Sequence, residues 1–178
     1  MGKAYESFRG DDGMLGYLEL AVLKYVHIIG AVMWAGGDSF IVLFLLPSLE
    51  KINQQSRSRL AVVLLPRIFR WFLYIGLATV LSGVGLVVYM GLLSLAVLTT
   101  RYGAMLFVGG LASLAALLNA NIYFKPKGKK LLQMMLNNPE TASPEYLENL
   151  GKVKRGLTLN VILLWFALLM MTLAGLRL

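Results

Sequence analysis

Long apolar segments separated by short polar stretches run through most of this chain. Four of them reach the roughly 20 residues that a helix needs to cross about 30 Å of hydrocarbon. They cover residues 17–46, 71–100, 102–124 and 156–176. Because these runs are continuously apolar rather than alternating, they favour helices over the strands of a membrane barrel. The pattern predicts an all-α fold, an integral membrane four-helix bundle in which residues 1–178 form a single transmembrane domain.

Polar positions between the apolar runs predict shorter elements. Residues 56–65 form an amphipathic stretch, which we expect Pro66 to end. The Asn-Asn-Pro run at 137–139 indicates a break in the longer connection. The Ser-Pro-Glu run at 143–145 then provides an N-cap, a first-turn proline and a first-turn acid. A helix is therefore predicted to start there and to lead toward the last span.

The overall composition agrees with a membrane protein. Hydrophobic residues make up 58% of the chain, charged residues make up 15%, and the mean hydropathy is +0.70. These values lie outside the usual range of soluble domains. The chain has no cysteine, which excludes disulfides, iron–sulfur clusters, CxxCH haem attachment and thiolate copper sites. Any metal would have to be held by nitrogen, oxygen or methionine sulfur.

The distribution of basic residues predicts how the bundle is oriented. The connections after the first and third spans contain Lys51, Arg57, Arg59, Arg67, Arg70, Lys125, Lys127, Lys129, Lys130, Lys152, Lys154 and Arg155. The opposite side has only Lys3, Arg9, Lys24, Arg101 and Arg177. By the positive-inside rule, we expect a multi-pass protein of the cell (plasma) membrane with both termini non-cytoplasmic. The net charge of +8 then serves orientation and attraction to anionic lipid heads, with no nucleic-acid partner.

One polar stripe runs along the first span. At about 100° per residue, Lys24, Trp34 and Asp38 project within about 60° of His27, the only histidine. Ionisable groups at membrane depth are costly and usually face a bundle interior, a ligand or water. His27 and Asp38 lie about 16 Å apart along the helix axis, so one ligand would not meet both side chains. We place His27 in the outer leaflet and Asp38 in the inner half.

Each of these residues also has an interpretation without a ligand. His27 would hydrogen-bond a Ser, a Thr or a carbonyl of a neighbouring helix. Lys24 would reach the outer interface whatever else it does. The carboxyl of Asp38 needs a partner or must be protonated. The glycine pairs at 36–37 and 109–110 are typical of close helix packing, and they would also give a flat cofactor room.

The first span carries a resemblance to known families. The spacing His27-x6-Trp34, followed by Gly-Gly at 36–37 and Leu-Pro at 46–47, resembles the first helix of the CopD-like copper-resistance membrane domain. Up to the Trp and Gly it is also similar to the HemJ-type protoporphyrinogen oxidases. The chain departs from both groups. Its Leu-Pro lies farther from the Trp than in HemJ-type proteins, and it lacks the further His or Met-rich motifs expected of copper-handling relatives.

The second span adds to the resemblance. Arg67-x2-Arg70 leads into an apolar segment with Leu-Ser-Gly at 81–83, which resembles the second helix of the CopD-like group. The likeness covers about the first half of the chain. It implies a four-helix membrane scaffold that handles either haem or copper, with His27 at the metal.

Haem suits these residues better than copper. One neutral imidazole suffices to hold a non-covalent haem b, with apolar contacts and basic groups at the propionates supplying the rest. Copper permeation would need several donors along a path. We expect the cofactor to contact Lys24, His27, Trp34, Met90 and Arg101, with His27 as the metal ligand.

Further contacts to the haem stay open. Arg177 is another candidate for a propionate. Met90 or the Met170-Met171 pair would supply a thioether as the sixth ligand, whereas the ordinary role of such methionines is to fill a core. A five-coordinate iron, a water ligand and a ligand from another subunit are equally compatible with the sequence.

The sequence thus predicts a membrane b-type haem-binding protein that acts as an electron-transfer or small redox module, and an oxidoreductase if it is an enzyme. Its partners would be the lipid bilayer and a membrane electron donor or acceptor, with homo-oligomerisation left open. One alternative is a copper or proton-coupled permease of the CopD-like type, in which His27, Asp38 and the methionines line a path. The other is a cofactor-free structural subunit of a membrane complex.

Overall fold

The computed structural model describes residues 11–137 and 143–176. Within them the chain forms helices and no strand: α2 (Asp11–Phe40), the π-helix η1 (Ile41–Leu45), α3 (Leu46–Glu50), α4 (Gln54–Tyr89), α5 (Leu95–Leu98), α6 (Arg101–Leu118), the π-helix η2 (Asn119–Phe124), α7 (Lys125–Asn137) and α8 (Pro144–Gly175). The predicted all-α class is confirmed.

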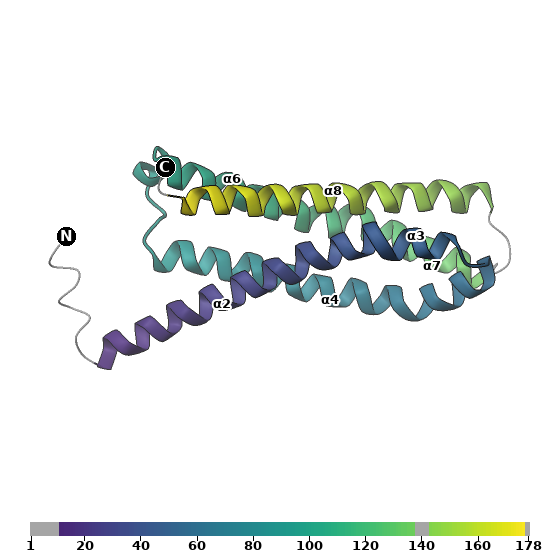
Figure 1. The fold of residues 1–178 in the computed structure, drawn as a ribbon, viewed down its shortest axis with the longest axis horizontal. Helices are drawn as coiled ribbons and strands as arrows, with labels where there is room; N and C mark the ends of the chain where they lie inside the picture. Colours follow the sequence, from purple (N-terminus) through teal and green to yellow (C-terminus); the bar gives the residue numbers. More distant parts are fainter. Residues whose placement is uncertain (1–10, 138–142, 177–178) are drawn as a thin grey trace.

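Four long rods build the bundle. The segments α2, η1 and α3 follow one another without a break, as do α6, η2 and α7. Among the described residues, four helices are long and apolar enough to cross a membrane: Gly16–Glu50, Gln54–Tyr89, Arg101–Asn137 and Pro144–Gly175. They run up and down in chain order, so that α2 begins and α8 ends at the same end of the bundle (Figure 1). We call this the terminal end, and the opposite end the basic end.

The second span ends earlier than its hydropathy predicts. The helix α4 stops at Tyr89 rather than near Thr100, because Gly91 adopts a φ of +67°, which an L side chain rarely tolerates. Ser94 is extended, and the short helix α5 completes the connection to α6. Residues 90–100 are as apolar as the span before them, so hydropathy alone does not separate the two.

The prediction that Pro66 ends a helix is wrong. Pro66 lies inside α4, and the helix continues through it from Gln54 to Tyr89. Proline removes one backbone hydrogen bond, but long membrane helices tolerate this loss where neighbouring segments hold the rod. Pro66 itself is exposed, whereas Ala61 and Phe69 on either side of it are buried in the bundle.

The predicted start of the last helix is confirmed. The Ser143 side chain accepts a hydrogen bond from the backbone N–H of Tyr146 at 3.2 Å, and Pro144 occupies the first turn of α8. One uninterrupted helix then runs to Gly175. The preceding break was predicted at 137–139. Asn137 is the last residue of α7, and the other two positions lie outside the described residues.

The bundle is made of two closely packed helix pairs. The helix α2 packs on α4 and α6 packs on α8 over the two largest interfaces in the bundle, and each interface between a helix of one pair and a helix of the other is smaller. The four rods lie side by side in Figure 1. Glycines on both partners of the first pair allow the close approach. A Cβ at Gly37 would lie 2.5 Å from the Phe72 ring, and one at Gly76 would lie 3.2 Å from the Trp34 ring.

Two hydrophobic clusters lie at different levels of the bundle. The central cluster contains Trp34, Ala35, Ile75, Ala116 and Leu164. The basic-end cluster contains Ile41, Ala61, Phe69, Phe124, Leu131, Met135, Tyr146, Val153 and Leu157. The helices are thus joined by one apolar layer near their middle and by another beside the Lys- and Arg-rich connections.

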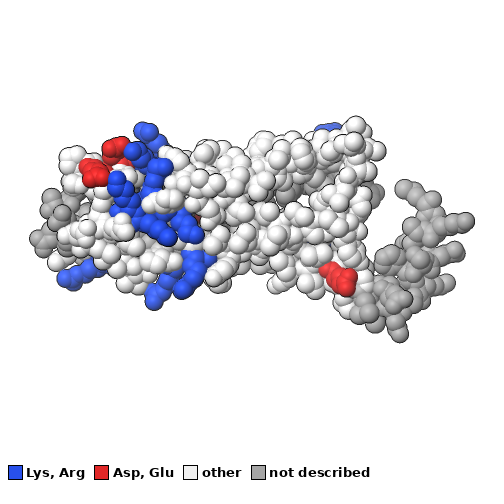
Figure 2. All heavy atoms as spheres, turned by 180° about the vertical axis from the view of Figure 1, so that it is seen from behind, with Lys and Arg blue, Asp and Glu red and all other residues white. Residues whose placement is uncertain are grey.

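Charge marks where a bilayer would end on this molecule. Figure 2 shows Lys and Arg side chains gathered in a band near one end, with a long and largely uncharged surface beyond it. From Arg70 to Tyr89 on α4 the rise is about 28 Å, which matches a hydrocarbon core of about 30 Å. The helices contain 32 to 37 residues each, so part of every rod projects beyond such a core at the basic end.

Candidate functional site

His27 is anchored to the neighbouring helix through its ring. Its Nδ1 lies 2.8 Å from the backbone carbonyl oxygen of Thr79 on α4. A carbonyl oxygen can only accept, so Nδ1 carries the proton and donates. In the neutral ring, the lone pair is then on Nε2. This is the neighbouring-helix hydrogen bond that the sequence offered as an alternative, and it orients the ring without using the second nitrogen.

The carbonyl that holds His27 belongs to a locally polar turn of α4. The Ser82 hydroxyl donates to the same Thr79 oxygen at 3.1 Å and to Ala78 O at 2.6 Å, and the Thr79 hydroxyl donates to Ile75 O at 2.8 Å. These hydroxyls bond carbonyl groups of their own helix. The hydrogen bond that joins α2 to α4 at this level is therefore the one donated by the imidazole of His27.

Two glycines make room for this contact. A Cβ at Gly83 would lie 2.8 Å from Cε1 of the His27 ring, and a Cβ at Gly30 would collide with the Thr79 hydroxyl. Real Cβ atoms essentially never come that close, so the ring could not occupy this position beside any other residue at 83. The glycine of the Leu-Ser-Gly run thus has a steric reason to be there.

The described residues leave Nε2 of His27 without a hydrogen-bond partner, and the atom is not enclosed by them. His27 lines a small cavity between the two helix pairs, of about 20 Å³. The other lining residues are Ala31, Trp34, Ala35, Thr79, Ser113, Leu164, Ala167, Leu168 and Met171. A space of this size holds about one water molecule.

The structure brings some of the predicted cofactor contacts together and separates others. Trp34, which is 1% exposed, and Met171 line the cavity with His27. Met90 does not: it caps α4, is 44% exposed, and lies about 16 Å along the helix from Thr79. Of the methionines considered as a sixth ligand, Met171 lines the cavity with His27 and Met90 does not.

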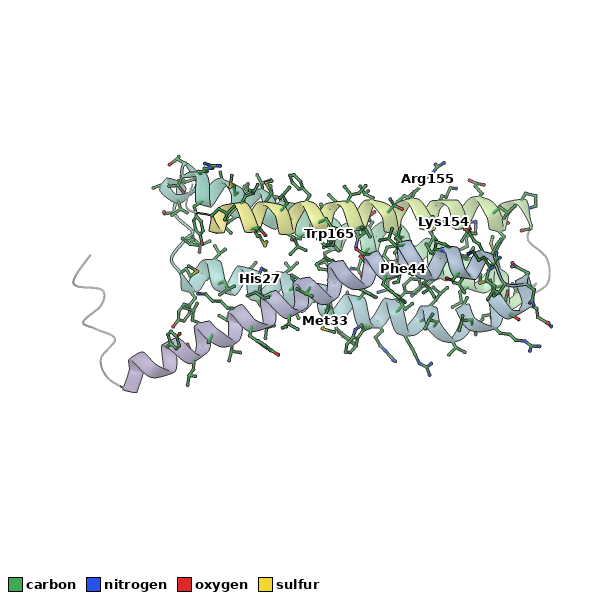
Figure 3. The ribbon with its side chains drawn as sticks, in the orientation of Figure 1. His27, Met33, Phe44, Lys154, Arg155 and Trp165 are labelled. Carbon is green, nitrogen blue, oxygen red and sulfur yellow. The ribbon has the colours of Figure 1, made fainter. Side chains whose placement is uncertain are left out.

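The basic residues expected at the propionates lie nearer the terminal end. Lys24 is exposed one turn before His27 on α2, and Arg101 is exposed at the first turn of α6. Neither lines the cavity. Arg177 lies outside the described residues. Figure 3 places His27 in the half of the bundle nearer the terminal end, and Lys154 and Arg155 nearer the basic end.

Asp38 belongs to a second polar group, which sequence reasoning found only in part. Asp38 is 2% exposed and accepts a hydrogen bond from Asn160 Nδ2 on α8 at 2.6 Å. Asn119 donates to Asn160 Oδ1 at 3.1 Å and to Gly156 O at 2.8 Å. A continuous amide–carboxyl chain therefore joins α2, α8 and the start of η2.

The predicted separation of His27 and Asp38 holds in the structure, since they have different partners and only His27 lines the cavity. Both π-helices begin beside the Asp38 group: η1 starts at Ile41 and η2 starts at Asn119. Such wide turns occur often at functional positions. The missed signal was Asn119 and Asn160 themselves, because amides are unusual in apolar spans.

The donor set of the described residues offers one imidazole with a free nitrogen. No group of three His, Cys, Asp or Glu side chains among the described residues could hold an ion. A porphyrin supplies four nitrogens itself, so one imidazole with a free Nε2 fits its iron. Its volume does not fit the cavity of about 20 Å³, because sites for small molecules enclose roughly 300 Å³ or more.

Comparison with protein-family models, with curated protein sequences and with solved structures gives no match to this chain. The resemblance to the CopD-like and HemJ-type families thus stands on the residues around His27 and in the second span.

Proposed function

We propose that this chain is a membrane protein that binds a non-covalent haem b through Nε2 of His27 and acts as an electron-transfer or small redox module. The observation that carries the proposal is the hydrogen bond from Nδ1 to Thr79 O. A metal-binding histidine characteristically donates its other ring N–H to a carbonyl or carboxylate, which sets the tautomer and the ring orientation.

Haem binding requires the two helix pairs to move apart at the cavity. Each interface between a helix of one pair and a helix of the other is smaller than the α2–α4 and α6–α8 interfaces. Separation of the pairs would widen the space beside His27 without breaking the α2–α4 contact that orients its ring. Trp34 and Leu168 would then provide apolar contact, and Met171 would lie on the wall contributed by α8.

The exposed basic groups suit the polar edge of the cofactor. Lys24 lies one turn from His27 toward the terminal end, where a propionate would leave the hydrocarbon. The haem would supply the one-electron chemistry, and the chain would bind its iron and exclude water. A redox module of this kind needs an electron donor or acceptor in or beside the membrane.

The orientation is part of the proposal. The band of Lys and Arg at the basic end faces the cytoplasm by the positive-inside rule, and both termini face the opposite side of the plasma membrane. His27 then lies in the outer half of the bilayer. This arrangement is supported by the distribution of charge on the molecule (Figure 2).

A second candidate function is favoured by the Asp38 group. A carboxyl that is 2% exposed and accepts from Asn160, whose own oxygen accepts from Asn119, resembles the intramembrane acids that carry protons in permeases. In that case Asp38, and not His27, would be the essential residue. A copper permease receives less support, because the chain has no second histidine and the described residues contain no group of three His, Cys, Asp or Glu side chains that could hold an ion.

Spectroscopy of the purified protein tests the proposal. The full chain is expressed with haem supply, purified in mild detergent and measured by absorption spectroscopy in the range where haem absorbs. A Soret band, a pyridine haemochrome of the b type and about one haem per chain are expected. A colourless protein that also takes up no added haem would contradict the proposal, and bound copper in metal analysis would favour the permease.

A further inference from the structure

One face of α4 combines charge, aromatic rings and a long apolar surface. An open groove of about 570 Å³ lies along this face, and its lining residues are Arg67, Ile68, Arg70, Trp71, Phe72 and Tyr74. We propose that this groove is a binding site for one anionic glycerophospholipid of the leaflet at the basic end. The inference is independent of haem.

The two arginines are available to a ligand. The ion pairs of the described residues join Lys130 to Glu145, Lys152 to Glu148 and Lys154 to Glu50, and none involves Arg67 or Arg70. Both arginines are exposed. They lie one turn apart on the same helix face, so their guanidinium groups can approach one phosphate together. Arginine is well suited to this, because its planar fork donates two parallel hydrogen bonds to phosphate oxygens.

The aromatic residues continue the site toward the middle of the bundle. Trp71 is 57% exposed and Tyr74 is 60% exposed, although both rings are large and apolar. Such rings are enriched at the membrane interface, where one part of the ring meets hydrocarbon and the other meets polar head groups. Their place directly after the arginines fits the glycerol region of a phospholipid.

An apolar stripe extends the same face for the acyl chains. Helical spacing from Arg67 places Tyr74, Leu81 and Val88 one above another on this face. Leu81 and Val88 are 66% and 55% exposed, and Val84 beside them is 56% exposed. Phosphate-binding groups, interfacial rings and an uncovered aliphatic surface therefore follow in the order in which a phospholipid presents its parts.

The depth of the arginines agrees with a head-group ligand. Arg70 lies about 28 Å along α4 from Tyr89, close to the thickness of a hydrocarbon core. The arginines thus lie at the level where phosphates are found, within the charged band of the molecule (Figure 2). The choline group of a zwitterionic lipid would place a cation near the arginines, so an anionic head group is favoured.

Native mass spectrometry tests the site. The full chain is equilibrated in mild detergent with equal amounts of phosphatidylglycerol and phosphatidylcholine. We expect one retained phosphatidylglycerol, preferred about tenfold over phosphatidylcholine. R67Q/R70Q should abolish this preference. The matched control K129Q/R155Q removes the same charge from the same end at two other exposed positions and should keep it.

Several results would overturn the inference. These are an unchanged preference in R67Q/R70Q, an equal loss in K129Q/R155Q, or a dimer that dissociates in R67Q/R70Q while lipid retention is unaffected. The last would mean that a second copy of the chain covers the groove. If the double variant does not fold, R67Q and R70Q are measured singly. Each should lower the preference about threefold, and no change in both would overturn the proposal.

Fluorescence gives a second test that keeps the arginines. Trp34 is buried and Trp165 is 56% exposed, so the variant W165F leaves Trp71 as the lipid-facing tryptophan. In vesicles made mostly of phosphatidylcholine, brominated phosphatidylglycerol at a low mole fraction should quench this variant more than equally brominated phosphatidylcholine does. Equal quenching by the two lipids would contradict a site for the anionic one.

Discussion

Asp38 and Asn160 are joined by a side-chain hydrogen bond of 2.6 Å that crosses from one helix pair to the other. Asp38 lies on α2 of the first pair and Asn160 on α8 of the second. The two pairs also contact each other through both hydrophobic clusters. This polar contact therefore contributes to the alignment of the two pairs, together with the hydrogen bond from Trp165 Nε1 to Ser39 Oγ at 2.9 Å.

Substitution of Asn160 should destabilise the bundle more than substitution of Asp38 by asparagine. The change N160L removes the donor and leaves the carboxyl of Asp38 buried without its partner, so we expect a loss of about 1–2 kcal/mol. The change D38N keeps an oxygen that can accept from Asn160 and should cost less than about 0.6 kcal/mol, the average of such bonds in membranes. Reversible unfolding in mixed detergent measures both.

The control for this comparison is N121L. Asn121 bonds Leu117 O within its own helix and has no side-chain partner on another long rod among the described residues. Its substitution should change stability less than N160L does. Equal losses of stability in N121L and N160L would mean that the hydrogen bond between the pairs contributes no more to stability than a bond within one helix.

Gly83 should be required for the position of the His27 ring. In G83A the new Cβ would lie 2.8 Å from Cε1 of the ring, and overpacking of this kind costs about 1–3 kcal/mol. We expect a lower thermal unfolding midpoint and a weaker haem spectrum. The matched change G110A meets nothing within 4 Å, so it should leave both unaltered. A normal midpoint and spectrum in G83A would argue against the contact.

His27 itself should be needed for haem but not for insertion. One side chain contributes little to the insertion of four long apolar spans, so H27A should reach the membrane with its helices intact. Its Soret absorption should be lost or strongly reduced, and added imidazole should restore part of it by occupying the vacated position. Full haem occupancy with an unaltered spectrum in H27A would contradict the assignment of His27 as the iron ligand.

A reporter fused after Leu178 should be active only outside the cytoplasm. By the positive-inside rule, the basic connections should be retained on the cytoplasmic side, which would place the end of α8 on the other. The same reporter inserted after Asn137, between α7 and α8, should give the opposite result. Cytoplasmic activity of the reporter after Leu178 would overturn the orientation.

Hydropathy predicted the number of long helices because each apolar run exceeds a bilayer's requirement. It could not predict where α4 begins and ends. Residues 90–100 remain apolar after the chain has left α4. The helix ends at the backbone of Gly91, whose φ is +67°, and the sequence does not show which of the many glycines adopts such a φ. Pro66 was a strong local signal, but the packing of the residues around it prevailed.

The candidate site was predictable residue by residue only where polarity was unusual. His27 and Asp38 stand out in an apolar span, and both prove to bond neighbouring helices. Their partners could not be deduced. One is a backbone carbonyl, which every residue has, and the other is one of three asparagines in the later spans. The sequence gives no reason to prefer Met171 to Met90, and only the packing of α8 places one of them beside His27.

The two hydrophobic clusters must be held together by different forces. Hydrocarbon tails are as apolar as leucine, so the central cluster gains nothing from leaving lipid and depends on close-fitting side chains. The basic-end cluster lies where the rods project past the hydrocarbon, and there water drives apolar side chains together. Urea should therefore loosen the basic end first, whereas a harsher detergent should first loosen the helices around Trp34. Water at the basic end and lipid around the middle of the bundle thus stabilise different parts of the same fold.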